Sequence, residues 1–137
     1  MTLGNMHRTA LASLSIVLAT VSHAQQPTLL NFACTGKMTD AMTGDKGQPI
    51  ENLGLVVNLT AKTVSFGGYS APFNTVDLAN IYFTGKNRNT LGMDVTVDGN
   101  LDRVTGAVDV TVITTASEKV VTTSYWNMVC KPATRLF

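Results

Sequence analysis

Apolar and polar residues alternate along most of this chain after its first two dozen residues, in short segments separated by turn residues. A period of two is typical of β-strands with one buried face. No apolar stripe with a helical period of useful length follows residue 24. In the first half of the chain, the positions predicted to face inward are Leu30, Phe32, Cys34, Leu55, Val57, Leu59, Val64, Phe66, Ile81 and Phe83.

The second half predicts a hairpin that turns at Asp98 and Gly99. An Asp-Gly pair between alternating segments is a strong signal for a two-residue turn. A further turn is expected at residues 116–119, and Pro132 is expected to end the last strand. The inward positions in this half are Leu91, Met93, Val95, Val97, Val104, Val108, Val110, Val112, Val120, Trp126, Met128 and Cys130.

About seven or eight short strands joined by tight turns predict an all-β domain, either a small antiparallel barrel or a sandwich. Residues 85–87 are expected to bound one of the strands. Residues 38–52 interrupt the alternation with Gly44, Gly47 and Pro49, and predict a long loop or an irregular hairpin.

The first 24 residues have the three parts of a secretory signal peptide: a start with one positive charge, an apolar run, and the small-residue cleavage site Ser22-His23-Ala24. The apolar run is about a dozen residues, whereas a spanning helix needs about 20, so we expect no integral membrane span in the mature form. The sequence predicts a periplasmic or secreted protein in which residues 25–137 form a single β-domain.

The chain has two cysteines, Cys34 and Cys130, on the inward faces of the first and last predicted strands. An exported compartment permits oxidation. A reactive thiol would need a Cys-x-x-Cys pair or a neighbouring base, and the sequence contains neither pattern. We therefore predict one structural disulfide that closes the fold and makes the first and last strands neighbours.

Both histidines, His7 and His23, lie in the predicted signal peptide. The mature chain can therefore form neither a Ser-His-Asp nor a Cys-His site, nor a histidine metal site, and we predict no metal and no cofactor. Removing Arg8 with the leader takes the formal charge from +1 to zero, and no basic run is present, so nucleic acid is not an expected partner.

Paired carboxylates are the chemistry that remains for an enzyme, and the candidates are Asp94, Asp98, Asp102 and Asp109. Asp94 and Asp109 both alternate onto outward faces, so we expect them to lie across from each other. Outward aspartates on strands are more commonly solvated surface groups, and we favour that interpretation over catalysis.

Four residues are predicted to have structural roles in turns: Asp98, Gly99, Asp102 and Arg103. The Asp102 carboxylate can accept backbone N–H bonds, and the Arg103 guanidinium can hold a neighbouring strand. Tyr69 and Tyr125 are candidates for a binding surface, because an exposed tyrosine can anchor a partner. Tyr125 precedes Trp126, so one of the two should pack in the core while the other faces outward.

Residues 31–36, 57–64, 99–106 and 130–132 together resemble a group of small exported alphaproteobacterial proteins of unassigned function. The resemblance implies a Gram-negative periplasmic or secreted origin. In size and cysteine layout the chain is also loosely similar to the periplasmic C-type lysozyme inhibitors. It has no residue-by-residue match to their binding loop, so no functional residue is carried over from them.

These observations favour a non-catalytic exported module that binds a protein or a small molecule. An inhibitor-like role is the most specific version of this hypothesis. The alternatives are a carboxylate-dependent hydrolase and a structural component of the envelope.

Overall fold

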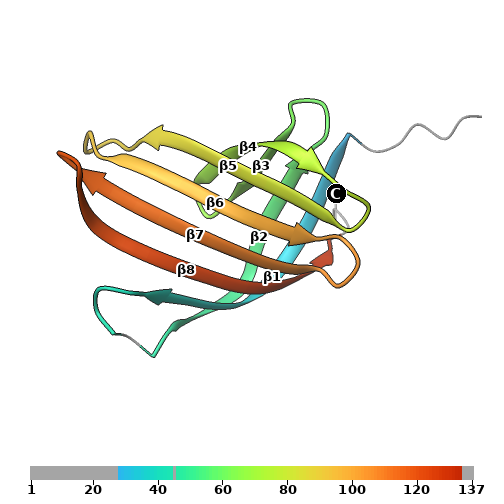
Figure 1. The fold of residues 1–137 in the computed structure, drawn as a ribbon. Coiled ribbons are helices and arrows are strands. Elements are labelled where there is room, and N and C mark those ends of the chain that lie inside the picture. The colour runs from blue at the N-terminus through green and yellow to red at the C-terminus, as the bar shows by residue number, and fades with distance from the viewer. Residues whose placement is uncertain (1–27, 45, 134–137) are drawn as a thin grey trace, which may run out of the picture.

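Eight antiparallel strands form a closed barrel in the computed structural model, which describes residues 28–44 and 46–133 (Figure 1). Each strand pairs with the next along the chain, and β8 pairs with β1. The predicted signal peptide lies outside the described residues. The strands are β1 (Leu29–Asp40), β2 (Gln48–Asn58), β3 (Thr63–Phe66), β4 (Tyr69–Val76), β5 (Asn80–Arg88), β6 (Asp94–Asp102), β7 (Ala107–Ala116) and β8 (Lys119–Pro132).

The inward faces of the strands fill the barrel with apolar side chains, as the alternation predicts. Leu30, Phe32 and Trp126 pack against this core without being fully buried. The buried residues are Cys34, Leu55, Val57, Val64, Phe66, Ala71, Phe73, Ile81, Phe83, Val95, Val97, Leu101, Val108, Val110, Val112, Met128 and Cys130. Ala71 and Phe73 belong to β4, a strand that the sequence did not predict. Interiors of eight-stranded barrels are just wide enough for such side chains to fill.

Four residues predicted to face inward are exposed instead: Leu59, Leu91, Val104 and Val120. The first three lie in connections between strands, where alternation no longer decides the direction of a side chain. Val120 lies beside the β7–β8 turn. Apolar residues therefore continue to alternate in the sequence for a few residues past the strand segments whose side chains are buried.

The predicted turn at Asp98 and Gly99 is wrong: both residues lie inside β6, and Gly99 pairs with Phe83 of β5 and Val110 of β7. The turn instead spans residues 103–106. Gly99 faces the interior, where a Cβ atom would collide with the Phe83 ring. Glycine is needed here because the Phe83 ring lies against the backbone of residue 99. From the sequence alone, a glycine of this kind cannot be distinguished from a turn glycine.

β1, β2 and β5 extend further along the chain than the alternation predicted. Residues 38–52 form the irregular hairpin that was one of the two predictions, with β1 reaching Asp40 and β2 beginning at Gln48. Residues 85–87 lie inside β5 instead of bounding it. The turn at residues 116–119 is confirmed: Ser117 and Glu118, both with positive φ, connect β7 to β8.

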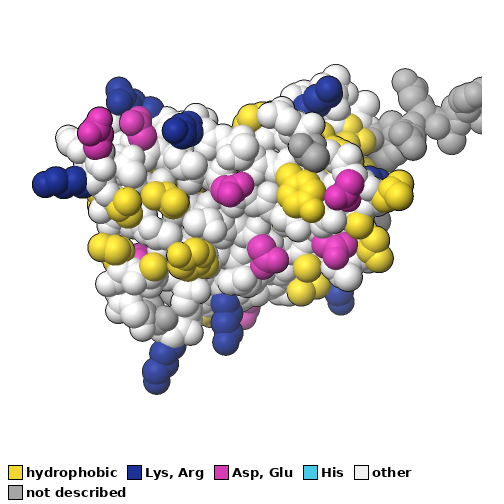
Figure 2. Space-filling model, viewed as in Figure 1, with side chains coloured by type: hydrophobic (Ala, Val, Ile, Leu, Met, Phe, Trp, Pro, Cys, Tyr) yellow, Lys and Arg dark blue, Asp and Glu magenta, His cyan; other side chains and the backbone are white. Residues whose placement is uncertain are grey.

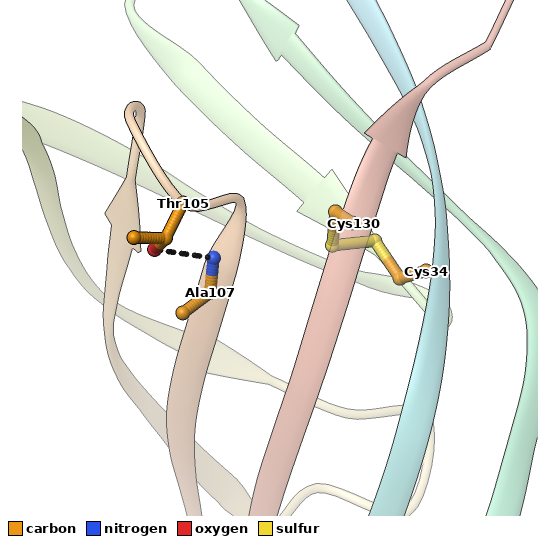
Figure 3. Close-up of a disulfide and its surroundings, with 4 residues drawn as sticks. All are labelled: Cys34, Thr105, Ala107 and Cys130. Atoms are coloured by element: carbon orange, nitrogen blue, oxygen red, sulfur yellow. Dashed lines mark hydrogen bonds between the residues drawn. A yellow bond between two sulfur atoms is a disulfide. The ribbon is translucent and has the colours of Figure 1, made fainter.

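The predicted disulfide is present and joins Cys34 of β1 to Cys130 of β8 (Figure 3). The two cysteines are direct partners across the β1–β8 pair, with their Cα atoms 4.0 Å apart. The bond therefore links the first and last strands where the sheet closes. None of the described residues forms a helix long and apolar enough to cross a membrane.

Candidate binding face

The outer surface of β5–β8 carries a hollow of about 310 Å³ lined by aromatic, acidic and amide side chains. Its floor includes the backbone at Gly99 and Val110. Seen from this side, acidic and apolar side chains lie scattered among polar ones, while basic side chains lie toward the edges (Figure 2). We call this surface the β5–β8 face; its side chains are Tyr82, Asp98, Asn100, Asp109, Thr111, Tyr125 and Asn127.

Strand register places these side chains in two neighbouring rows that cross the barrel wall. In the first row Tyr82 lies opposite Asn100, which lies opposite Asp109, which lies opposite Asn127. In the second row Asp98 lies opposite Thr111, and Thr111 lies opposite Tyr125. Because neighbouring strands are ~4.8 Å apart, Tyr82 and Tyr125 stand on the order of 14 Å from each other at opposite sides of the hollow.

Both tyrosines of the face are half-exposed, with 44% of each residue accessible to solvent. Tyr125 and Trp126 point to opposite sides of β8, as expected from their adjacency. Trp126 packs against the core with Phe66 and Tyr69, while Tyr125 borders the hollow. Tyr82 was not a candidate from the sequence; its alternation with the buried Ile81 and Phe83 is the signal that could have identified it as outward.

Asp98 and Asp109 bring two exposed carboxylates into the same hollow. They are diagonal neighbours on β6 and β7, since Asp98 lies opposite Thr111, two residues along the strand from Asp109. Within residues 28–44 and 46–133 the only ion pair is Arg88–Asp94, at 3.1 Å. Neither carboxylate of the hollow therefore has a cationic partner in the described chain.

The expected pair of Asp94 and Asp109 does not form. Asp94 lies opposite Thr115 near the other end of β6 and is bonded to Arg88, whereas Asp109 lies opposite Asn100. The carboxylates that share a surface are Asp98 and Asp109. Asp98 was among the candidate carboxylates, but its assignment to a turn meant that it was not paired with Asp109.

Asn100 lies in the first row, between Tyr82 and Asp109, with one polar atom unsatisfied. Its amide nitrogen donates a hydrogen bond of 3.2 Å to Asn80 Oδ1, while its own Oδ1 is buried and has no partner. A buried acceptor without a donor is costly. A small rearrangement that brings a ligand donor to Asn100 would recover that cost.

Tyr69, the other predicted surface tyrosine, is not among the residues that line the hollow. Its ring is 5.8 Å from that of Phe66 and 6.1 Å from that of Trp126, measured between centroids. Tyr69 is therefore part of an aromatic cluster at one end of the barrel, and the structure does not bring it together with Tyr125. The Trp126 indole nitrogen in this cluster is buried without an acceptor.

Asp102 and Arg103 lie at the turn between β6 and β7. Asp102 Oδ1 accepts hydrogen bonds from the backbone N–H groups of Thr105 (3.1 Å) and Val104 (2.8 Å), and these hold the pKa of Asp102 below its ordinary value. Arg103 bonds to Ala79 through its backbone N–H, 2.6 Å from the carbonyl oxygen, and not through the expected guanidinium.

Within the described residues, histidine, cysteine, aspartate and glutamate do not gather in any group of three or more that could hold a metal ion. Comparison of the chain with protein-family models, curated proteins and solved structures finds no match in any of the three. The resemblances noted from the sequence stay predictions.

Proposed function

We propose that this protein is a non-catalytic exported module that binds another protein through its β5–β8 face. The observation that carries the proposal is the hollow itself, in which two half-exposed tyrosines flank two unpaired carboxylates and two carboxamides. Tyrosine is enriched among the residues that dominate protein interfaces, because it combines a large apolar ring with a polar hydroxyl.

The shape of the face favours a macromolecule over a small ligand. Small-molecule sites are clefts that enclose most of their ligand, and their lining is predominantly apolar. The hollow here is an open depression on the outside of a sheet, and the barrel interior is filled by its own apolar side chains. A broad, mixed polar and aromatic surface is the usual composition of a protein interface.

Export is part of the proposal and rests on two features. The first 24 residues have the pattern of a signal peptide, and the Cys34–Cys130 disulfide suits an oxidising compartment. A periplasmic or secreted location would place the β5–β8 face in contact with envelope or extracellular proteins.

A carboxylate-dependent hydrolase is the competing function, because Asp98 and Asp109 do share a hollow. Both are exposed to water on strands of an open surface. Acid catalysis by a carboxyl group calls for desolvated surroundings that keep it protonated. The face lacks such surroundings, so we favour binding.

Site-specific photocrosslinking tests the proposal in the host that produces the protein. Thr111, at the centre of the hollow, is replaced by benzoylphenylalanine in the full chain, and Asn74, an exposed residue of β4 outside the face, receives the same replacement as a control. We expect a discrete protein adduct from position 111 that disappears when Tyr82→Ser and Tyr125→Ser are added. Equal adducts from both positions, or none from position 111, would contradict the proposal.

A further inference from the structure

We infer that the partner presents an arginine side chain whose guanidinium group lies between Asp98 and Asp109. This inference rests on the proposed function and specifies the chemistry of the partner at the same face. The argument depends on the diagonal placement of the two carboxylates, on their lack of a cation, and on the rings beside them.

The two carboxylates are spaced for one bridging cation. Diagonal neighbours on adjacent antiparallel strands have their Cβ atoms on the order of 7 Å apart. A guanidinium group has five N–H donors in a fixed planar fork, so it can donate to one carboxylate from each edge. An ammonium group is a compact point charge without this reach. The spacing therefore favours arginine over lysine.

The charge of the hollow is complementary to such a group. Asp98 and Asp109 repel each other, and no described lysine or arginine lies within ion-pair distance of either. The nearest cation in register is Lys86 of β5, which lies opposite Thr96 and so diagonal to Asp98, on the side away from Asp109, and it forms no ion pair with Asp98. A partner cation between the carboxylates would remove their repulsion and form charge-assisted hydrogen bonds to both.

The aromatic side chains add a second kind of contact for the same group. Tyr82 borders the hollow on the β5 side and Tyr125 on the β8 side. A guanidinium group stacks favourably on an aromatic face through cation–π attraction. Asn100 lies in the row between Tyr82 and Asp109, and its buried, unpartnered Oδ1 would become a further acceptor if its side chain rearranged.

Matched peptides test the inference directly. A glycine- and serine-flanked hexapeptide with one central arginine is titrated into the full-length, disulfide-bonded protein, and amide chemical shifts are followed by NMR. The comparison peptides carry citrulline, which has the same shape without the charge, or lysine. We expect the arginine peptide to shift the β5–β8 face, and the citrulline peptide to bind at least about tenfold more weakly.

Variants assign the effect to the hollow. The double variant Asp98→Asn/Asp109→Asn should weaken arginine-peptide binding by about tenfold or more. Asp94→Asn removes one carboxylate outside the hollow and should leave binding within about twofold. Lys86→Gln removes the nearest competing cation and should strengthen binding modestly at low salt.

The outcomes separate this inference from the proposed function. Equal binding of the arginine and citrulline peptides overturns it, and equal binding of arginine and lysine overturns the assignment to arginine. If the arginine peptide leaves the face unperturbed while position 111 still crosslinks to a protein, the inference fails and the proposed function stands. If a neutral oligosaccharide shifts the face and no protein adduct forms, both fail.

Discussion

At the scale of single residues, Gly99 shows how an interior contact can imitate a turn signal. Asp98-Gly99 has the composition of a hairpin turn, yet the chain continues straight through it as β6. The reason lies on another strand, where the Phe83 ring occupies the space that a side chain at position 99 would need. A large ring opposite a missing side chain is how this barrel fits an aromatic residue into its interior.

We expect Gly99→Ala to destabilise the protein by about 1–3 kcal/mol, because the added methyl group overpacks the core against Phe83. Urea unfolding followed by circular dichroism would measure the loss. Gly54→Ala is the matched control, since a Cβ atom there meets nothing within 4 Å. Combining Gly99→Ala with Phe83→Leu should reduce the cost of the alanine. Equal effects at positions 54 and 99 would show that the close approach is unimportant.

At the scale of elements, the β6–β7 turn is held by hydrogen bonds from its own side chains and from β8. The Asp102 carboxylate accepts hydrogen bonds from two backbone N–H groups of the turn, and Gly106 ends the turn with a φ of +78°. Thr105 Oγ1 accepts a hydrogen bond of 3.2 Å from the backbone N–H of Ala107 (Figure 3). The carbonyl oxygen of Gly106 accepts a hydrogen bond of 2.8 Å from the N–H of Cys130, so the turn is also attached to β8 beside the disulfide.

The acid stability of the protein should depend in part on this turn. Backbone N–H groups of Thr105 and Val104 lower the pKa of Asp102 in the folded state, and those of Ala79 and Asn80 lower that of Asp77 in the β4–β5 turn. The unfolded chain then binds protons more readily. The stabilisation is present above about pH 4 and is lost as the pH falls through the lower folded pKa.

We therefore expect Asp102→Asn, which keeps the Oδ1 acceptor, to lose less stability than the wild type between about pH 5 and pH 2. Thermal unfolding midpoints at a series of pH values would measure the difference. Asp77→Asn should act in the same direction, and the double variant should have the flattest acid profile. Identical acid profiles for wild type and variants would refute this role for the two carboxylates.

At the scale of the whole molecule, the closure of the sheet is the dominant feature. β1 pairs with both β2 and β8, so the sheet closes and neither its first nor its last strand is an edge strand. Unpaired edges invite association with other strands, and closure removes them. The Cys34–Cys130 bond fixes this closing pair, which joins strands 96 residues apart in sequence.

Replacing both cysteines by alanine should destabilise the protein by about 4–5 kcal/mol, because the bond closes a long loop in the unfolded chain. Urea unfolding in the presence and absence of a reductant would measure this. Reduction should shift the wild-type midpoint and leave that of the Cys34→Ala/Cys130→Ala variant unchanged. A wild-type midpoint that does not move on reduction would contradict a stabilising role.

The candidate site was only partly predictable. Tyr125 was expected to be a surface aromatic from its position beside Trp126, and it borders the hollow. Asp98 was not paired with Asp109 because of the false turn, and Tyr82 was not proposed although its alternation with Ile81 and Phe83 places it outward. The first error concerns strand length. A single β6 from Asp94 to Asp102 puts Asp98 and Asn100 on the outward face.

By itself the sequence determined the all-β class, most of the inward positions and the pairing of its two cysteines. Period-two alternation is a local property of each segment, and two cysteines allow only one pairing within the chain, so both can be read without the structure. The tertiary structure decided that the sheet closes as a barrel, that Gly99 serves the Phe83 ring, and that Asp98 and Asp109 share a surface. Each of these depends on the register between strands, which is set by side chains packing across the barrel and not by the order of residues along any one strand.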